Sequence, residues 1–443
     1  MKIVSIIAVA ALLGTNLAGA SDQIPAPGQS QILALRGATI YPVSGPPIPG
    51  GTIVLSGGKI TMLGSRVAVP DGAEVIDVSG KRIYPGLINA YTSIGLTEIG
   101  SVRGTRDMRE VGRINPNVRA EVSVNPGSEI IPVTRANGIT MALSAPAGGT
   151  ISGRSAMLML DGWTWEDMVL KASVGLHVTW PRMTISHAWW MRDSEEKQRE
   201  NRQKSLDALF GAFRDARAYM KARASNGRRS TPRHPTDLRW EAMIPVFKKE
   251  MPVIVTANGV RQIQAAVAWA KTEGLRLVLV GGADAWRVAD LLKERDIPVI
   301  VGGTHLTPRR RWEDYDSPYT LPLKLHEAGI RYCISSAMGF SGSGEASNAR
   351  NMPYEAATAA AYGLPQDEAL KAITLYPAQI LGVDDRVGSL EVGKDATLIV
   401  TDGDPLETPT HVERMYIQGR NIDLTSRHTM LYGKYKTKYN QKR

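Results

Sequence analysis

The sequence contains a single cysteine, Cys333, among 443 residues, and seven histidines. One cysteine excludes an internal disulfide framework and any zinc or iron–sulfur cluster held by cysteines alone. No apolar run reaches the length of about 18 residues that spans a bilayer, so no transmembrane segment is expected. A metal site would have to be built from histidines and carboxylates, and seven histidines suffice for one only if the right few come together in the fold.

The N-terminus has the layout of a secretory signal peptide. The basic start, Met1-Lys2, is followed by an apolar run over residues 3–13 and by small residues that end in Ala18-Gly19-Ala20. A positive start, a short apolar core and an A-x-A cleavage site are the three parts of such a peptide. We predict that residues 1–20 are removed and that the protein is periplasmic or secreted; an uncleaved anchor is the alternative.

The formal charge of +10 is unevenly distributed. Residues 427–443 contain six basic side chains and no acidic one, so the body of the protein is close to neutral. This distribution gives no reason to expect a nucleic-acid partner. The basic tail, residues 425–443, is predicted to be solvated; contact with anionic lipid or with an acidic partner is the alternative.

Two strand-rich segments near the chain ends enclose a longer middle with a different pattern. Residues 31–84 and 388–417 carry short β-branched runs separated by turn residues, which is typical of a small antiparallel sheet. Their similar character predicts a β-sandwich module formed by both chain ends, from residues 21–84 and 379–424.

The middle of the chain alternates apolar strands with helices, which indicates the α/β class. Four such units follow one another, with strands expected over residues 252–257, 275–280, 297–302 and 330–335. Strands that are apolar along their whole length are typical of a parallel sheet covered on both faces. A (β/α)8 TIM-like barrel over residues 85–378 fits best, and a doubly wound sheet is the alternative. The charge-rich residues 193–235 predict a helical insertion, either solvated or used as a partner-binding arm.

Three stretches carry a resemblance to a known family: VSGKRIYPGLIN (78–89), LKAITLYPAQILGV (370–383) and GSLEVGKDATLIVTDGDPL (388–406). They resemble the start and end of the barrel in the amidohydrolase superfamily, and most closely its imidazolonepropionase-like branch. The resemblance implies a hydrolase of non-peptide carbon–nitrogen bonds, in amides or cyclic amides. It also implies a divalent metal such as zinc, which would activate a water molecule. In the family the ligands are an His-x-His pair on the first strand, single histidines on the fifth and sixth strands, and an aspartate on the eighth.

This sequence departs from that ligand pattern at every position. The family's positions are occupied by Tyr91, Ser93, Thr256, Gly281 and Ser336, with Ala337 as the neighbouring possibility on the last strand. Hydroxyl groups do not replace neutral imidazole and carboxylate in a tight site for a first-row metal. We therefore expect no metal to bind at these positions.

Other polar residues are candidates for a site at the barrel mouth. His305 follows the seventh strand and is the candidate catalytic imidazole; a hydrogen-bonded loop or core histidine is the alternative. The same alternative applies to His177 and His187. The candidate substrate-binding residues are Tyr91, Thr150, Arg154, Asn258 and His305. In the glycine-rich stretch 146–155, Thr150 and Arg154 could hold an anion, or the stretch is a tight turn. The arginines 309–311 could meet a carboxylate of a substrate or of an acidic partner.

Two functions of different classes remain open. The chain is an exported amidohydrolase relative with an altered site, acting on a small-molecule substrate. Alternatively, it is a catalytically inactive barrel that forms a hetero-oligomer with an intact amidohydrolase relative, using the charged helix and the basic tail. The loss of the ligand positions together favours weak or absent metal hydrolysis.

Overall fold

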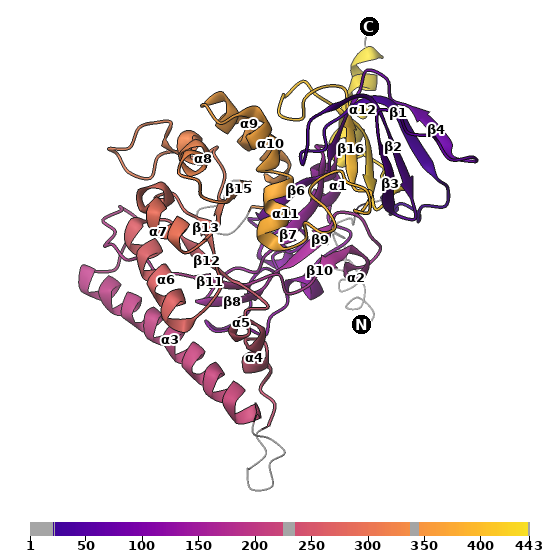
Figure 1. Cartoon of the computed structure of the whole chain (residues 1–443). Coiled ribbons are helices and arrows are strands. Elements are labelled where there is room, and N and C mark those ends of the chain that lie inside the picture. The colour runs from indigo at the N-terminus through magenta and orange to yellow at the C-terminus, as the bar shows by residue number, and fades with distance from the viewer. Residues whose placement is uncertain (1–20, 22, 225–234, 337–344, 442–443) are drawn as a thin grey trace, which may run out of the picture.

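The computed structural model describes residues 21, 23–224, 235–336 and 345–441 (Figure 1). The predicted signal peptide lies outside the described residues. Within them, the chain forms an outer sheet and a barrel-like body that pack side by side. No helix in these ranges is long and apolar enough to cross a membrane.

The outer sheet joins both ends of the described chain, as predicted. Its strands are β1 (Leu33–Ile40), β2 (Ile48–Ser56), β3 (Lys59–Gly64), β4 (Glu74–Asp77), β5 (Arg82–Pro85), β16 (Leu398–Thr401), β17 (Val412–Ile417) and β18 (Arg420–Asn421). They are ordered β18-β17-β16-β5-β1-β2-β3, with β4 pairing to β1. The antiparallel pair β5–β16 connects the two ends, with Pro85 opposite Leu398.

One glycine divides an edge of β1 between two partners. The first half of β1 pairs with β4 as far as Arg36, and the second half pairs with β5 from Thr39. Gly37 lies between them with a φ of +94°, and a Cβ there would lie 2.3 Å from Ser79 Oγ. A larger residue is therefore excluded by both backbone conformation and space. The sheet surrounds its own apolar core, which includes Leu35, Ile53, Leu55, Leu398 and Tyr416.

The barrel strands form two hydrogen-bonded sheets. The strands are β6 (Leu87–Thr92), β7 (Ile139–Ser144), β8 (Ile151–Arg154), β9 (Ala156–Met159), β10 (Val169–Lys171), β11 (Leu176–Thr179), β12 (Val253–Ala257), β13 (Leu277–Gly281), β14 (Val299–Val301) and β15 (Tyr332–Ile334). One sheet has the order β10-β9-β7-β6, and the other has the order β15-β14-β13-β12-β11-β8. Neighbours from β11 to β15 are parallel, and so are β6 and β7.

The barrel wall contains one antiparallel part, outside the four predicted strand–helix units. β8 and β9 are separated by Ser155 alone, and they run antiparallel to β11 and β7 respectively. This antiparallel run joins the two sheets. At the other edge of the two sheets, β15 lies beside β6. The contact is made by Ser335, directly after β15, whose hydroxyl is shared between Asn89 Oδ1 at 2.8 Å and the Tyr91 carbonyl at 2.9 Å.

The four predicted strand–helix units are all present. β12 to β15 are followed by α6 (Val260–Glu273), α7 (Ala289–Glu294), α8 (Ser317–Glu327) and α9 (Met352–Ala361). α10 (Gln366–Lys371) and α11 (Leu375–Leu381) then lead back to the outer sheet. Short helices precede these units, namely η1 (Arg103–Thr105), η2 (Ala120–Ser123), α1 (Ile130–Arg135) and α2 (Trp165–Met168), or lie within them, namely η3 (Ala285–Val288) and η4 (Ala349–Asn351).

The charged insertion forms α3 (Glu195–Ala224), which runs along the outside of the barrel (Figure 1). Its outer face carries ion pairs such as Arg199–Glu195. Its inner face is apolar, because Phe213 is fully buried against Trp269 and Phe247, with ring centroids 4.8 and 5.9 Å away. The helix is therefore solvated on its outer face and packs on the core through a short apolar stretch of its inner face. α4 (Leu238–Glu241) and α5 (Ile244–Phe247) follow it.

The basic tail folds as a helix, α12 (Arg427–Asn440). The hydroxyl of Ser426 accepts a hydrogen bond from the Thr429 amide and caps its first turn.

Candidate functional site

The ends of the parallel strands bring Tyr91 of β6 and Thr256 of β12 together inside the barrel. Tyr91 is 4% exposed, and its hydroxyl is hydrogen-bonded to that of Thr256. Burial raises the pKa of Tyr91 to about 12, although the hydrogen bond from Thr256 acts in the opposite direction. The phenol is therefore protonated at neutral pH and cannot serve as a base there.

A second hydrogen-bonded group lies between the first and last strands. Asn89 donates from Nδ2 to Ser336 Oγ at 3.0 Å, and its Oδ1 accepts from the Ser335 hydroxyl and from the Ser336 amide. All three side chains are fully buried. Sequence reasoning missed Asn89 and Ser335, which are separated by 246 residues. Their polarity within apolar strands was the available signal, because a buried amide requires partners.

The remaining family ligand positions hold no metal-binding side chain. Ser93 is buried just after β6, and Gly281 ends β13 with a φ of +93°. A Cβ at position 281 would lie 2.6 Å from Asn258 Oδ1, so the Asn258 side chain fills the space that a ligand on the sixth parallel strand would need. Asn258 Oδ1 also accepts a hydrogen bond from the Ala283 amide at 3.5 Å. Asn258 thus shapes the end of β13.

The donor set does not fit zinc. Tyr91, Ser93, Thr256 and Ser336 offer neutral hydroxyls, and Gly281 offers none, whereas zinc takes thiolate, imidazole and carboxylate ligands. Across the described residues, no three His, Cys, Asp or Glu side chains are grouped so that they could hold a metal ion. Ala337, the neighbouring candidate position, lies outside the described residues.

His177 of β11 faces this interior. Its ring centroid lies 5.8 Å from that of Tyr91, and its side chain is 3% exposed. Neither ring nitrogen has a hydrogen-bond partner in the described part of the chain. Burial lowers the pKa of His177 to about 3, so the imidazole is neutral at neutral pH.

His305, the candidate catalytic imidazole, is turned toward α9 instead. Its Nε2 lies 2.8 Å from Thr358 Oγ1, and its Nδ1 lies 3.7 Å from Glu355 Oε1. The backbone amides of Thr304 and His305 donate to Glu355 Oε2 at 2.5 and 2.6 Å. These contacts tie the loop after β14 to α9. The structure therefore does not bring His305 together with Tyr91, and His187 lies on the surface with its side chain 75% exposed.

Thr150 and Arg154, the two candidates for an anion site, lie apart along the wall formed by β8 and β11. Because β8 is antiparallel to β11, the Thr179 amide donates to the Thr150 carbonyl at the carboxyl end of β11, whereas Arg154 pairs with Leu176 at its amino end. Arg154 donates to Ser173 Oγ and to the Asn117 carbonyl, both at 3.2 Å. The two candidates lie at opposite ends of the barrel wall.

Among the arginines 309–311, Arg310 meets carboxylates of this chain. Arg310 contacts Asp284 at 2.5 Å and Glu313 at 2.6 Å. Burial acts to raise the pKa of Asp284, but the hydrogen bonds and charge of Arg310 hold it below its usual value. Arg310 also lies over the ring of Trp312. Arg310 is thus paired with carboxylates of its own chain and needs no acidic partner from another molecule.

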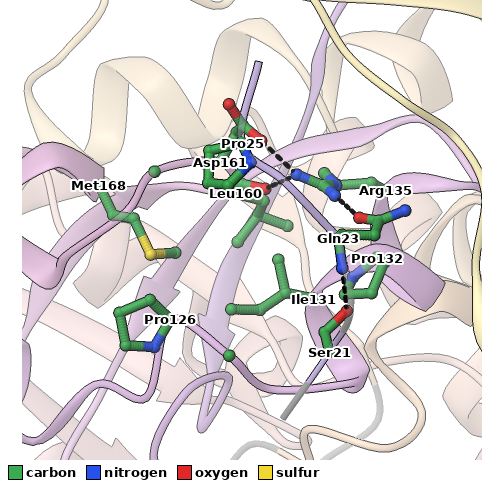
Figure 2. Close-up of a pocket in the computed structure, with 12 residues that line it drawn as sticks. Ser21, Gln23, Pro25, Pro126, Ile131, Pro132, Arg135, Leu160, Asp161 and Met168 are labelled. Carbon is green, nitrogen blue, oxygen red and sulfur yellow. Dashed lines mark hydrogen bonds and ion pairs between the residues drawn. The ribbon is translucent and has the colours of Figure 1, made fainter. Parts of the chain in front are cut away.

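A small, partly open cavity lies away from this interior, beside the chain segment that follows the predicted cleavage site (Figure 2). It has a volume of about 30 Å³, which is the space of one water molecule. On its wall Arg135 donates to Asp161 at 2.6 Å and also to Gln23. Asp161 is paired with Arg420 of the outer sheet at 2.8 Å. The cavity holds a structural ion pair and is too small for a substrate.

Comparison with known proteins identifies the fold. A crystal structure of an amidohydrolase from Thermotoga maritima superposes with a TM-score of 0.77 at 27% identity, covering 88% of this chain and 99% of that one. The sequence model of the Amidohydrolase family matches residues 319–434. The chain belongs to the amidohydrolase superfamily. It is therefore a TIM-barrel member of a superfamily of hydrolases, as the end motifs predicted.

Two curated relatives place this superfamily member more closely. Imidazolonepropionase from Symbiobacterium thermophilum is 23% identical in an alignment of 394 positions, gaps included, that covers 85% of this chain and 88% of that protein. The chain lies in the imidazolonepropionase-like branch. Amidohydrolase tasK from Hapsidospora irregularis is 23% identical in an alignment of 437 positions, gaps included, that covers 87% of this chain. This superfamily member spans only 42% of the length of tasK.

Proposed function

We propose that this chain is a non-hydrolytic amidohydrolase-type barrel that binds an intact relative and works with it in the periplasm or outside the cell. The observation that carries the proposal is the hydrogen-bonded interior, in which Tyr91 is bonded to Thr256 and Asn89 to Ser335 and Ser336. These groups use their hydrogen-bonding capacity on one another. Metal-assisted attack by water needs charged or imidazole ligands with an open position, and this donor set supplies neither.

The length of tasK supports an intact partner. More than half of that protein lies outside the match to this chain, which is room for a second unit of similar size. In the proposal, a relative that retains the His-x-His pair supplies the hydrolytic site, and this chain supplies a binding surface.

Exposed tryptophans before α3 are the proposed contact. Trp189 is 96% exposed and Trp190 is 54% exposed, and the guanidinium of Arg182 lies 5.9 Å from the Trp190 ring. Tryptophan and arginine are enriched among the residues that dominate binding energy at interfaces. The adjoining charged face of α3 provides a polar rim.

The test is co-expression of the full chain with an amidohydrolase from the same genome that keeps the His-x-His pair, followed by size-exclusion chromatography. We expect the two to co-elute, and replacement of Trp189 and Trp190 by serine to separate them. The matched control is Trp163→Ser, since Trp163 is 67% exposed and follows a different strand. Hydrolysis by the complex should be lost on changing the partner's histidine pair and kept in Tyr91→Phe of this chain.

A second candidate is the hydrolysis of non-peptide carbon–nitrogen bonds by this chain alone, which its 27% identity to the Thermotoga maritima amidohydrolase favours. Chelator-sensitive hydrolysis of N-acyl or cyclic-amide compounds by the chain purified alone would support this candidate and overturn the first.

A further inference from the structure

α12 has little tertiary cover: its start lies near α1, where His428 Nδ1 is 3.5 Å from Arg350 Nη1. Every residue from Arg427 to Gln441 is exposed, although the helix contains leucine and three tyrosines. It extends from the body beside the outer sheet, at the top of Figure 1. Isolated helices of about this length are marginal in water, and most helices in proteins are stabilised by burying one face. A surface that covers α12 would supply the missing stabilisation.

Most of the aromatic and apolar side chains of α12 lie on one face. His428, Leu431, Tyr435 and Tyr439 follow one another at intervals of three or four residues, and Tyr432 lies beside them. They line a shallow, open hollow together with Lys436. The opposite face carries Gly433, Thr437 and Asn440, together with one apolar side chain, Met430. We call the first set the tyrosine stripe.

Cations border the tyrosine stripe on both sides. Helical spacing places Lys436 at one edge and Lys434 and Lys438 at the other. The ammonium groups lie close to the rings: Lys436 is 5.6 Å from the Tyr432 centroid, and Lys438 is 5.7 Å from that of Tyr435. From residue 424 to the end of the sequence there is no acidic side chain. The exposed face therefore presents rings and positive charge together.

We propose that α12 binds the anionic lipid surface of a membrane, lying flat with its tyrosine stripe at the boundary between headgroups and acyl chains. Tyrosine rings have an apolar body and a polar tip, which suits this boundary. Lysines at both edges can extend to phosphate groups while their stems cover apolar surface. A second copy of the chain fits poorly, because pairing two such helices would bring together two sets of cations with no acid between them.

Binding to vesicles tests the proposal with the full chain. We expect sedimentation with phosphatidylcholine vesicles that contain about 30% phosphatidylglycerol and little with phosphatidylcholine alone, since anionic lipid attracts basic segments. Replacing Lys434, Lys436 and Lys438 by glutamine should weaken the partition about 100-fold, at about fivefold per charge. Replacing the three tyrosines of the stripe by serine should weaken it as well, because apolar area contributes to interfacial binding.

A matched control keeps the same change in net charge. Lys197, Lys204 and Lys221 are exposed on α3, and their replacement by glutamine should leave vesicle binding unchanged. All variants keep the same N-terminal segment. A difference in vesicle binding between the α12 variants and the α3 variant therefore comes from α12. Equal loss in the α3 variant, or no loss in both α12 variants, would overturn the proposal. Binding of α12 to a soluble acidic polypeptide but not to the vesicles would overturn it in favour of an acidic partner.

The orientation of the helix gives an independent readout. The sole native cysteine, Cys333, is fully buried, so a spin label attaches selectively to an introduced thiol. On vesicles, a label at Leu431→Cys should become accessible to lipid-soluble oxygen, and a label at Thr437→Cys should remain accessible to a water-soluble relaxant. Equal accessibility at the two positions would contradict a helix lying flat on the stripe.

Discussion

His177 makes the stability of this protein depend on pH in a way that can be calculated. Its ring is 3% exposed and neutral, with a pKa lowered by burial to about 3, whereas an unfolded histidine titrates near 6.5. Because the folded pKa lies below the unfolded one, protons bind the unfolded chain preferentially between these values. Stability from this group is therefore complete above about pH 6.5 and falls as the pH drops toward 3. Between about pH 7.5 and about pH 5, the loss is about 2 kcal/mol.

Urea unfolding of wild type and His177→Phe at these two pH values measures this contribution. Phenylalanine keeps a ring next to Tyr91 but binds no proton, so the wild type should lose about 2 kcal/mol more than the variant on acidification. His187→Gln is the control, since the exposed ring of His187 is expected to leave the pH dependence of the wild type unchanged. An equal loss of stability in wild type and His177→Phe would refute the assignment of a buried neutral imidazole.

Two further predictions concern the packing that holds the barrel and the outer sheet together. Asp161→Asn should destabilise by about 3–5 kcal/mol, because Arg135 and Arg420 would lose their buried partner; Asp296→Asn, at an exposed pair with Arg331, should cost about 1 kcal/mol or less in the same urea titration. Phe213→Ala should cost about 3–5 kcal/mol and loosen α3, since Phe213 is fully buried against Trp269. Phe210→Ala, on the same helix but 40% exposed, should cost clearly less, and similar losses in the two variants would contradict the buried face assigned to α3.

The outer sheet and the four strand–helix units could be predicted because their signals are local. The β-branched runs of β2 and β16, and the apolar strands β12 to β15 with their following helices, express their structure within a few residues. The motifs at 78–89 and 388–406 gave the superfamily for a similar reason, since they form the strands β5, β6 and β16 that join sheet and barrel.

Strand direction and side-chain orientation could not be predicted in the same way. The run containing β8 and β9 is apolar whether it is parallel or antiparallel, so its pattern did not reveal that Thr150 and Arg154 separate. His305 follows β14 as predicted, but its ring direction is set by Glu355 and Thr358 on α9, about fifty residues further along. Ser335 and Asn89 meet only when the last and first strands come together. Such long-range contacts depend on tertiary structure that no local pattern contains.

The metal content of the purified full chain tests the central claim most directly. After expression in medium supplemented with zinc and dialysis against metal-free buffer, elemental analysis should find well below one equivalent of any transition metal per chain. This result is expected because Tyr91, Ser93, Thr256, Gly281 and Ser336 occupy the ligand positions. A full equivalent of zinc that survives dialysis and is lost in His177→Ala would contradict the account.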